Sequence, residues 1–217
     1  MLDSLNRTIG ICGFKGAGKD TSADHLVAKH GYRKTSLAAP IKKVVKEIFD
    51  FPDEHLYSSS HLREVQDERY RFSGLDPVDG SPLHPVRLSR DQFWQRESDG
   101  EFFPEFLSPR FALTTMGTEW GRRLTDSIWV SACLNQIRRS ASDRWVVPDV
   151  RFLNEVEAIQ SAGGKVVRLL RGMRTSSHPS ELEMETIPHS KFDICIDNQG
   201  SKEDLFEQLD RFMRGLE

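Results

Sequence analysis

Hydrophobic and polar positions along the start of the chain alternate between strand-like and helix-like patterns. An apolar run over residues 8–12 predicts a buried strand, and a helix should follow from about Lys19. A second strand is expected over residues 32–37. A further helix should begin near Pro40, because apolar residues then recur at i, i+3, i+4, i+7 and i+8 from Ile41. This β-α-β-α order favours a parallel sheet covered by helices.

Residues 53–109 interrupt the pattern. They are rich in Pro, Gly, Ser, Asp, aromatic and mixed charged residues, with a short helical pattern only near 61–71. Such a stretch is too long for an ordinary connection between two elements. We predict an inserted lobe here, and a surface loop without regular structure is the alternative.

Regular patterns return at Arg110 and continue to the end of the chain, with one polar and irregular segment among them. We expect helices over 113–120 and 130–137, a strand over 145–147, a helix over 152–159 and a strand over 165–170. The irregular segment covers 171–191. A strand over 192–196 and a final helix over 205–212 follow it. Ser201 and Asp204 have the spacing of a capping box for the last helix. The whole chain, 1–217, is therefore expected to form one α/β domain with an open parallel sheet.

Composition narrows the class of protein. No apolar run approaches the roughly 18 residues of a membrane-spanning helix, so no membrane segment is expected. The net charge of −3 gives no basic field for nucleic acid. Three distant cysteines, Cys12, Cys133 and Cys195, match no metal-binding spacing and are typical of a reduced cytoplasm. The histidines show no i, i+4 pair with a third ligand, and no serine lies in a nucleophile elbow.

The segment Gly13-Phe-Lys-Gly-Ala-Gly-Lys-Asp-Thr21 carries the strongest chemical signal. It follows an apolar strand and opens a helix, which is the context of a P-loop. Backbone N–H groups can surround phosphate oxygens there because Gly13, Gly16 and Gly18 have no side chains, and the helix N-terminus adds positive potential. Lys19 would meet the β- and γ-phosphates. A glycine-rich turn that binds no ligand is the alternative interpretation.

The residue after Lys19 departs from the usual P-loop pattern. Asp20 stands where Ser or Thr is common, and the hydroxyl comes one place later, at Thr21. Lys-x-Thr is familiar from nucleoside monophosphate kinases. We expect Thr21 to complete the Mg²⁺ shell, and contact of Asp20 with the metal through water stays open.

A second acidic position follows the strand Trp145-Val-Val-Pro. In a parallel sheet, the carboxyl ends of strands face the ligand crevice, so Asp149 is predicted to orient the metal or the acceptor, with Arg151 beside it. The alternative role for Asp149 is to cap the next helix.

Transfer between two phosphates needs positive charge and exclusion of water more than a general base, because an acceptor monophosphate is already largely dianionic. Cations at element ends or in loops after the P-loop fit this need: Lys42, Arg110, Arg122, Arg151, Arg171 and Arg174.

The whole chain resembles the bacteriophage deoxynucleoside monophosphate kinase family of P-loop kinases. The P-D-x-R block at 148–151 and the D-x-x-I-x-N-x-G block at 193–200 discriminate best. Four blocks carry the resemblance: GFKGAGKDTSADHL (13–26), LAAPIKKV (37–44), MGTEWGRRLTDSIWV (116–130), and VVPDVRFLNEVEAIQSAGGKVVRLLR with HPSELE and FDICIDNQGSKEDL (146–205).

The resemblance implies a doubly wound parallel sheet of the P-loop nucleoside monophosphate kinase type. It also implies a mobile lid, at 171–191, and transfer from ATP with Mg²⁺ to a dNMP for viral DNA synthesis. The resemblance does not cover 53–109, which we predict from its own pattern to be the acceptor-side lobe. A homodimer and a location in the host cytoplasm are part of the same expectation. By position, the ATP-side residues are Gly13, Gly16, Ala17, Gly18, Lys19, Asp20, Thr21, Asn198 and Gly200, with the last two near adenine. Lys42, Arg122 and Arg151 would face the acceptor phosphate, Arg171 would belong to the lid, and Thr21 and Asp149 would serve the metal.

Other readings stay open at this point. The GKD P-loop, the L-x-x-P-x-K block and the D-x-R motif also resemble phosphomevalonate kinases, and the tail resembles dephospho-coenzyme A kinases. A kinase for modified bases in DNA is disfavoured by the mild acidity. An ATP-binding switch or ATPase would need neither the downstream arginines nor the insertion.

Overall fold

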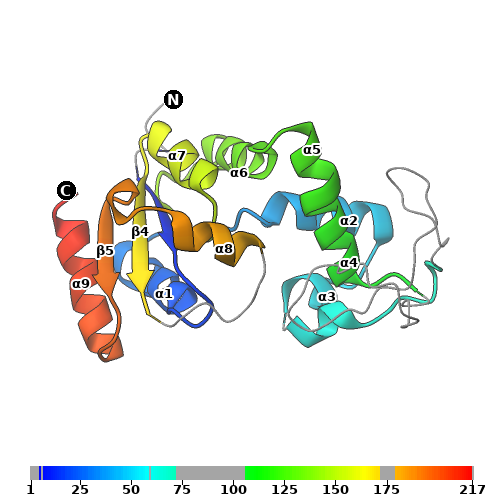
Figure 1. The fold of residues 1–217 in the computed structure, drawn as a ribbon, viewed down its shortest axis with the longest axis horizontal. Coiled ribbons are helices and arrows are strands. Elements are labelled where there is room, and N and C mark those ends of the chain that lie inside the picture. Colours follow the sequence, from blue (N-terminus) through cyan, green and yellow to red (C-terminus); the bar gives the residue numbers. More distant parts are fainter. Residues whose placement is uncertain (1–4, 6, 59, 72–105, 172–178, 217) are drawn as a thin grey trace. The chain divides into compact units, whose positions relative to one another are not determined.

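The computed structural model describes residues 5, 7–58, 60–71, 106–171 and 179–216. The chain forms two compact units (Figure 1). One consists of Met1–Ala39 and Ser127–Glu217, and the other of Pro40–Asp126. None of the helices in the described ranges has the length and apolar character needed to cross a lipid bilayer.

The first unit is built on a five-stranded sheet in the order β2-β3-β1-β4-β5, and every neighbouring pair is parallel. The strands are β1 (Thr8–Cys12), β2 (Arg33–Lys34), β3 (Trp145–Val150), β4 (Lys165–Leu170) and β5 (Ile194–Asp197). The predicted parallel sheet is confirmed. Three strands differ from the prediction: β2 pairs over two residues only, β3 extends beyond 147, and β5 begins at Ile194 instead of residue 192.

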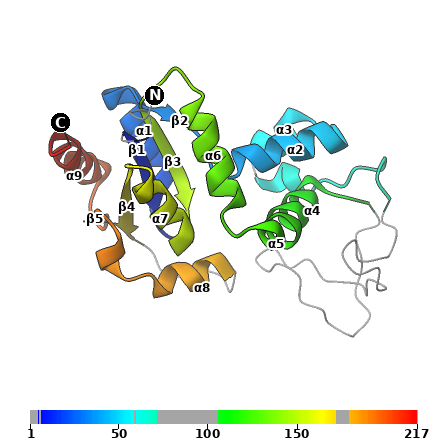
Figure 2. The ribbon, with the colours of Figure 1, turned by 90° about the horizontal axis from the view of Figure 1, so that it is seen from above.

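Helices cover both faces of this sheet, as a doubly wound fold requires (Figure 2). One face carries α1 (Lys19–His30) and α9 (Lys202–Arg214). The other carries α6 (Ile128–Arg138), α7 (Leu153–Ser161) and α8 (Pro179–Thr186). The open α/β architecture expected from the sequence is therefore present.

Alternating strand residues feed two separate hydrophobic cores. Ile9, Ile11 and Val167 pack towards α1 and α9, whereas Cys12 and Val166 pack towards α6 and α7. Successive side chains of a strand point to opposite faces, so a central strand buried on both sides reads as a continuous apolar run. This is why the sequence predicted β1 and β4 with correct bounds.

The segment 171–191 is more regular than the sequence indicated. It contains α8 and a 3₁₀ turn at His189–Lys191, and Met184 and Ile187 are buried in the core on the α6–α7 side. The expectation of an irregular segment was wrong here, because a helix of eight mostly polar residues gives only a weak periodic signal. Residues 172–178, including Arg174, lie outside the described residues.

The second unit is helical in its described part. It contains most of α2 (Ala39–Phe49), α3 (Asp53–Tyr57), α4 (Pro109–Thr114), a π-helical segment at Thr115–Gly121 and α5 (Arg122–Leu124). The last three follow one another without a break and confirm the helix expected over 113–120. Gly117 lies against α2, since a Cβ there would come within 2.8 Å of Ile41 Cδ1.

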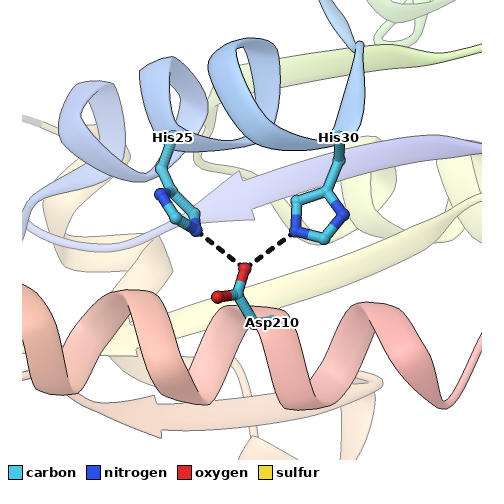
Figure 3. A group of neighbouring side chains, drawn as sticks. All are labelled: His25, His30 and Asp210. Carbon is cyan, nitrogen blue, oxygen red and sulfur yellow. Dashed lines mark hydrogen bonds and ion pairs between the residues drawn. The ribbon is translucent and has the colours of Figure 1, made fainter.

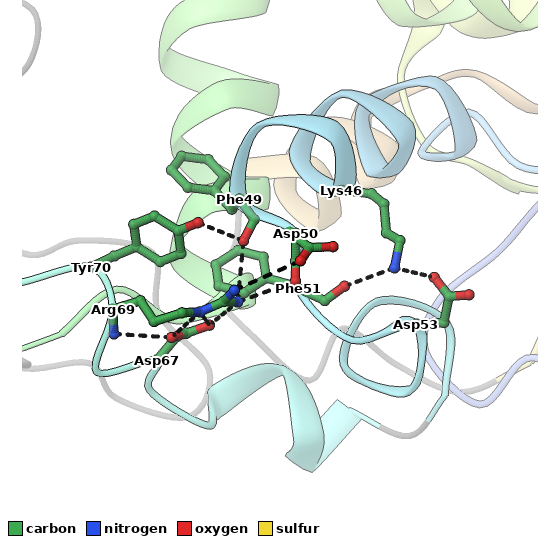
Figure 4. A network of polar contacts seen from close by, with 8 residues as sticks. All are labelled: Lys46, Phe49, Asp50, Phe51, Asp53, Asp67, Arg69 and Tyr70. Carbon is green, nitrogen blue, oxygen red and sulfur yellow. Dashed lines mark hydrogen bonds and ion pairs between the residues drawn. The ribbon is translucent and has the colours of Figure 1, made fainter.

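A polar network ties the end of α2 to residues 67–70 (Figure 4). Arg69 donates hydrogen bonds to the Asp67 carboxylate and, through Nη2, to the backbone oxygen of Asp50 (3.1 Å). The Tyr70 hydroxyl donates to the Phe49 carbonyl oxygen (2.8 Å), and its ring meets that of Phe49 edge to face. Residues that follow α2 are therefore held by the segment that leads towards residue 71.

The predicted insertion at 53–109 is described only at its two ends. The helical pattern expected near 61–71 corresponds to a 3₁₀ turn at Ser60–Glu64. Arg71 and Phe106 form an antiparallel bridge, and the Leu107 N–H donates to the Tyr70 carbonyl oxygen (2.8 Å). The chain thus enters and leaves the interval 72–105, which lies outside the described residues, at neighbouring points.

Candidate active site

The loop between β1 and α1 has the backbone of a phosphate cradle. Gly16 and Gly18 have φ angles of 80° and 93°, in the left-handed region that side chains disfavour. A Cβ on Gly16 would meet nothing within 4 Å, whereas one on Gly18 would lie 2.8 Å from Asn198 Nδ2. The Ala17 N–H donates to the Phe14 carbonyl oxygen (3.1 Å) and closes a tight turn. The loop is therefore fixed behind Gly18 and open at Gly16.

Lys19 is the first residue of α1 and bends back across this loop. Its Nζ donates hydrogen bonds to the carbonyl oxygens of Gly13 (2.7 Å) and Phe14 (2.8 Å). The first backbone N–H groups of a helix have no partner within the helix. The start of α1 therefore presents N–H donors, and the positive end of the helix dipole, beside the Lys19 ammonium group. An anion placed at the loop would meet all of these charges together.

Asn198 holds the same loop from the far side. It follows β5, its side chain is buried, and Nδ2 donates to the Ala17 carbonyl oxygen at 2.9 Å. The Asn198 N–H donates to the Leu170 carbonyl oxygen at the end of β4 (3.2 Å). The amide that the resemblance assigned to the adenine region thus supports the P-loop. Gly200 lies further along, just before the Ser201 capping box.

Asp20 and Thr21 occupy different surroundings in the first turn of α1. The Asp20 carboxylate is 80% exposed and forms an ion pair with Lys34 Nζ at 2.8 Å. Lys34 also contacts Asp24 (2.9 Å), and these hydrogen bonds raise the pKa of Lys34 despite the opposing effect of its partial burial. Thr21 is partly buried beside them. The Asp20 carboxylate is directed to β2 by this ion pair.

Asp149 lies on a bulge in β3. Gly10 and Cys12 of β1 pair with Val147 and Val150 of β3, so Pro148 and Asp149 together oppose a single residue. Bulges redirect side chains and are common beside active sites, and proline suits them because it has no N–H to pair. The extra residue accounts for the orientation of Asp149 towards the segment before α2.

The Asp149 carboxylate binds two backbone groups of that segment. Its Oδ1 accepts from the Leu37 N–H (2.9 Å) and its Oδ2 from the Ala38 N–H (3.2 Å). Burial raises the pKa of Asp149, although both hydrogen bonds and nearby Arg151 act in the opposite direction. Each carboxylate oxygen has two lone pairs, so both retain the capacity to accept from a water or a metal-bound water.

A different carboxylate caps the helix that follows. Glu155 Oε2 accepts from the N–H groups of Arg151 (2.8 Å) and Phe152 (3.1 Å) at the start of α7. The alternative reading of Asp149 as the cap is therefore wrong. Sequence reasoning did not single out Glu155, although an acidic residue in the first turn of a helix is a recognisable signal.

Arg168 is a second residue that sequence reasoning missed. It is the one charged residue among the buried middle positions of β4, and only 5% of its surface is exposed. Nη1 donates to the carbonyl oxygens of Met184 (3.0 Å) and Ile187 (3.4 Å), and the guanidinium lies 5.1 Å from the Phe192 ring centroid. The cation anchors the end of α8 to the sheet. A lone arginine in an apolar strand was the available signal.

A pocket of about 300 Å³ opens beside the P-loop at the carboxyl ends of the strands. Its walls come from the loop after β1, residues 168–171 at the end of β4, His189, and the end of β5 with the segment after it, Asp197 and Gln199. Arg171 is exposed at its rim. This is the position where open parallel sheets bind ligands.

The remaining predicted cations divide between the two units. Arg151 belongs to the first unit, at the start of α7. Lys42 and Arg122 belong to the second, where Lys42 Nζ lies 5.2 Å from the Tyr57 ring centroid and Arg122 begins α5. Arg110 in the same unit pairs with Glu64 (2.9 Å). The structure thus brings Asp149 near Arg151, and Lys42 and Arg122 occur on separate helices of the other unit.

A parallel sheet with helices on both faces, a glycine loop after β1 and a lysine at the start of α1 define the chain as a P-loop protein of the nucleotide-binding class. No family model matches the sequence. Curated relatives do. A protein of Acanthamoeba polyphaga mimivirus, provisionally assigned as a deoxynucleotide monophosphate kinase, is 30% identical over 93% of both chains.

Two phage proteins are similar over large shares of the chain. The deoxynucleotide monophosphate kinase of Escherichia phage RB69 is 23% identical over 95% of this chain and 99% of its own. The deoxynucleoside-5'-monophosphate kinase of Escherichia phage T5 is 28% identical over 70% of this chain and 71% of its own. The present chain belongs to the deoxynucleotide monophosphate kinase family.

Proposed function

We propose that this protein transfers the γ-phosphate of ATP to a deoxynucleoside monophosphate, giving dNDP and ADP. Similarity to named deoxynucleotide monophosphate kinases over nearly the whole chain carries the proposal. The P-loop supports it independently, because its open glycine backbone, its lysine and the helix end converge on one anion site.

On the donor side, the N–H groups of residues 13–21 bind the phosphates of ATP and Lys19 offsets the charge at the β- and γ-phosphates. The nucleoside occupies the pocket beside β4 and β5, near Asn198 and Gly200. Arg171 at the rim of that pocket supports a role beside the transferred phosphoryl group. Asp20, in the first turn of α1, contributes its backbone N–H to the ATP phosphates, while its carboxylate is paired with Lys34.

Thr21 and Asp149 fit a magnesium ion in their donor chemistry. Mg²⁺ prefers oxygen ligands and keeps several waters, and these residues supply a hydroxyl and a buried carboxylate at the two elements that flank the P-loop strand. Asp149 retains lone pairs after accepting from Leu37 and Ala38. Thr21 and Asp149 would hold the ion, which would supply positive charge against the charge that develops on the donor phosphates.

On the acceptor side, the assignment of Lys42, Arg122 and Arg151 to the monophosphate stays a prediction from the sequence. The acceptor needs no strong base because its phosphate is largely dianionic at neutral pH. These cations lower the repulsion between donor and acceptor instead. Residues 53–109 act as the acceptor-side lobe and residues 171–191 include the lid. Homodimer formation and residence in the host cytoplasm stay predictions from the sequence.

The acceptor is tested by coupled ADP release with ATP and Mg²⁺. The panel contains every common NMP and dNMP, hydroxymethyl-dCMP, hydroxymethyl-dUMP, phosphomevalonate, dephospho-coenzyme A and duplex DNA. Turnover restricted to deoxynucleoside monophosphates supports the proposal. Turnover with a non-nucleotide acceptor or with DNA alone would leave P-loop chemistry in place and overturn the acceptor. ADP release that needs no acceptor would make the protein an ATPase.

A further inference from the structure

Two histidines and an aspartate meet on the α1–α9 face of the sheet (Figure 3). His25 and His30 belong to α1, and Asp210 to α9. We refer to these three residues as the α1–α9 cluster. It lies away from the P-loop end of α1, since His30 is separated from Lys19 by about 16 Å of helix. None of the proposed steps of phosphoryl transfer uses it.

Both histidine rings contact the same carboxylate oxygen of Asp210. Asp210 Oδ1 lies 2.8 Å from His25 Nε2 and 2.8 Å from His30 Nε2, and the ligand atoms all lie within 4.8 Å of one another. The side chains of His25, His30 and Asp210 are only 10%, 15% and 10% exposed. A buried convergence of two imidazoles and a carboxylate is a donor set that suits borderline divalent metals.

Neighbouring groups fix the orientation of the cluster. The His25 ring stacks on Phe206, one turn before Asp210, with centroids 4.0 Å apart and planes inclined by 7°. Lys29 Nζ contacts Asp210 Oδ2 at 2.7 Å, and Arg144 Nη1 donates to the His30 carbonyl oxygen at 2.9 Å. The His25 ring and the carboxylate therefore approach the shared point from a defined direction, which is what supporting contacts do around metal ligands.

The charge of the Asp210 carboxylate also suits a metal ligand. Burial would raise the pKa of Asp210, but hydrogen bonds from Lys29, His30 and His25 hold it well below its usual range, so the group is ionised near neutral pH. Lys29 occupies Oδ2, while Oδ1 faces the imidazoles. The lysine side chain is 57% exposed, so it can remain on Oδ2 as an outer partner when Oδ1 binds a cation.

We propose that His25 Nε2, His30 Nε2 and Asp210 Oδ1 bind a divalent transition-metal ion, zinc in the first place, with water as the fourth ligand. Ligand atoms around a tetrahedral zinc ion are about 3.3 Å apart, so the two N···O separations must open by roughly 0.5 Å from the present 2.8 Å.

Metal binding would exchange the tautomers of both histidines. An ionised carboxylate only accepts, so Nε2 of each ring carries the proton in the present arrangement. A bound ion needs unprotonated Nε2 atoms, and neutral imidazoles then carry the proton on Nδ1. The ion would link α1 to α9 and fix the helix whose other end forms the P-loop.

Zinc titration of tag-free, chelator-stripped full-length protein without nucleotide tests the site. Wild type should take up one zinc ion per chain by calorimetry, and Co²⁺ should give the visible bands of a tetrahedral complex. At a zinc concentration about a hundredfold above Kd, the Tm should rise by roughly 5–10 °C. Imidazole ¹H–¹⁵N spectra should show the change to Nδ1-protonated tautomers.

Glutamine variants separate metal binding from folding. In His25→Gln and His30→Gln, the side-chain amide can still donate to Asp210 but is a poor zinc ligand, so the metal-free Tm should stay near that of wild type. Zinc affinity should fall about tenfold or more in either variant. His55→Ala, which changes a histidine of the second unit, and Thr21→Ala should bind zinc as wild type does.

Two results would overturn the site. The first is unchanged zinc uptake by both glutamine variants, which would locate the ion elsewhere. The second is no uptake by wild type at any concentration that leaves the protein folded, which would leave the α1–α9 cluster as a hydrogen-bonded link between two helices. Neither result would bear on the kinase proposal, whose test is acceptor-dependent turnover.

Discussion

The Asn198 side chain donates a hydrogen bond from Nδ2 to the Ala17 carbonyl oxygen at 2.9 Å, across 181 positions of sequence. It thereby joins the end of β5 to the middle of the P-loop. Backbone N–H groups can bind phosphate without reorganisation only if the loop keeps its shape, so this contact connects the packing of the sheet edge to nucleotide binding.

Replacing Asn198 should therefore affect both stability and the use of ATP. Asn198→Ala leaves the buried Ala17 carbonyl oxygen without its donor, which should cost about 1–3 kcal/mol of unfolding free energy. The KM for ATP should rise because the loop is less constrained. Urea denaturation and initial rates measure the two effects. Lys202→Ala, an exposed position at the start of α9, serves as the control, and equal effects of both variants would contradict the support role.

The two glycines of the loop should respond differently to alanine. Gly16→Ala places a Cβ in open space, so only its left-handed backbone should lower the unfolding free energy, by about 1–2 kcal/mol. Gly18→Ala is destabilised by its left-handed backbone in the same way, and its Cβ would also lie 2.8 Å from Asn198 Nδ2. We expect a larger loss of stability and of ATP affinity for Gly18→Ala in parallel denaturation and binding assays. The reverse order would show that the contact with Asn198 is not maintained.

Arg168 and Arg171 offer a matched pair on one strand and its end. Arg168→Met should destabilise the protein by about 1–3 kcal/mol, because the Met184 and Ile187 carbonyl oxygens lose a buried donor. Arg168→Lys should recover part of that loss. The exposed Arg171→Met should change stability by less than about 0.5 kcal/mol while lowering kcat. A stability loss of the same size in Arg171→Met would remove this distinction.

Asp193 should contribute to stability in a pH-dependent way. Burial would raise its pKa, but hydrogen bonds from Gln160 and the Val166 N–H and contact with Lys165 hold the pKa below the ordinary value. A depressed folded-state pKa stabilises the protein above the unfolded-state pKa of about 4, and this contribution is lost as pH falls through the folded-state pKa.

Unfolding free energies of wild type and Asp193→Asn should therefore differ by a constant amount from pH 6 to 8. The difference should shrink as the pH is lowered from about 4 towards the folded-state pKa. Chemical denaturation at a series of pH values gives both curves. A difference that grows on acidification would have the wrong sign for a depressed pKa.

Local patterns predicted the parts of the molecule that lie close together in sequence. The P-loop could be predicted because its strand, glycines and lysine form one contiguous segment. The capping box of α9 could be predicted because it needs only Ser201 and Asp204. Continuous runs of buried, mostly apolar residues gave β1 and β4 their correct bounds. The short β2 was overextended because burial at Tyr32 and Leu37 looks the same with or without pairing to β3.

Contacts between distant segments were not accessible to the same reasoning. The bulge that directs Asp149 depends on its register with β1, and its partners Leu37 and Ala38 lie more than a hundred positions away. His25 and His30 are five apart rather than four, so helical spacing alone did not mark them as partners. Asp210, which joins them, comes from the last helix.

Transfer of label from [γ-³²P]ATP to each of the four common dNMPs, resolved by thin-layer chromatography, tests the phosphoryl transfer most directly. Wild type with Mg²⁺ should yield labelled dNDP from at least one dNMP. Lys19→Ala should yield none above background while retaining the wild-type fold by circular dichroism, because the charge that holds the β- and γ-phosphates is gone. Labelled dNDP formed by Lys19→Ala at a near wild-type rate, or none formed by wild type from any dNMP, would contradict the proposed reaction.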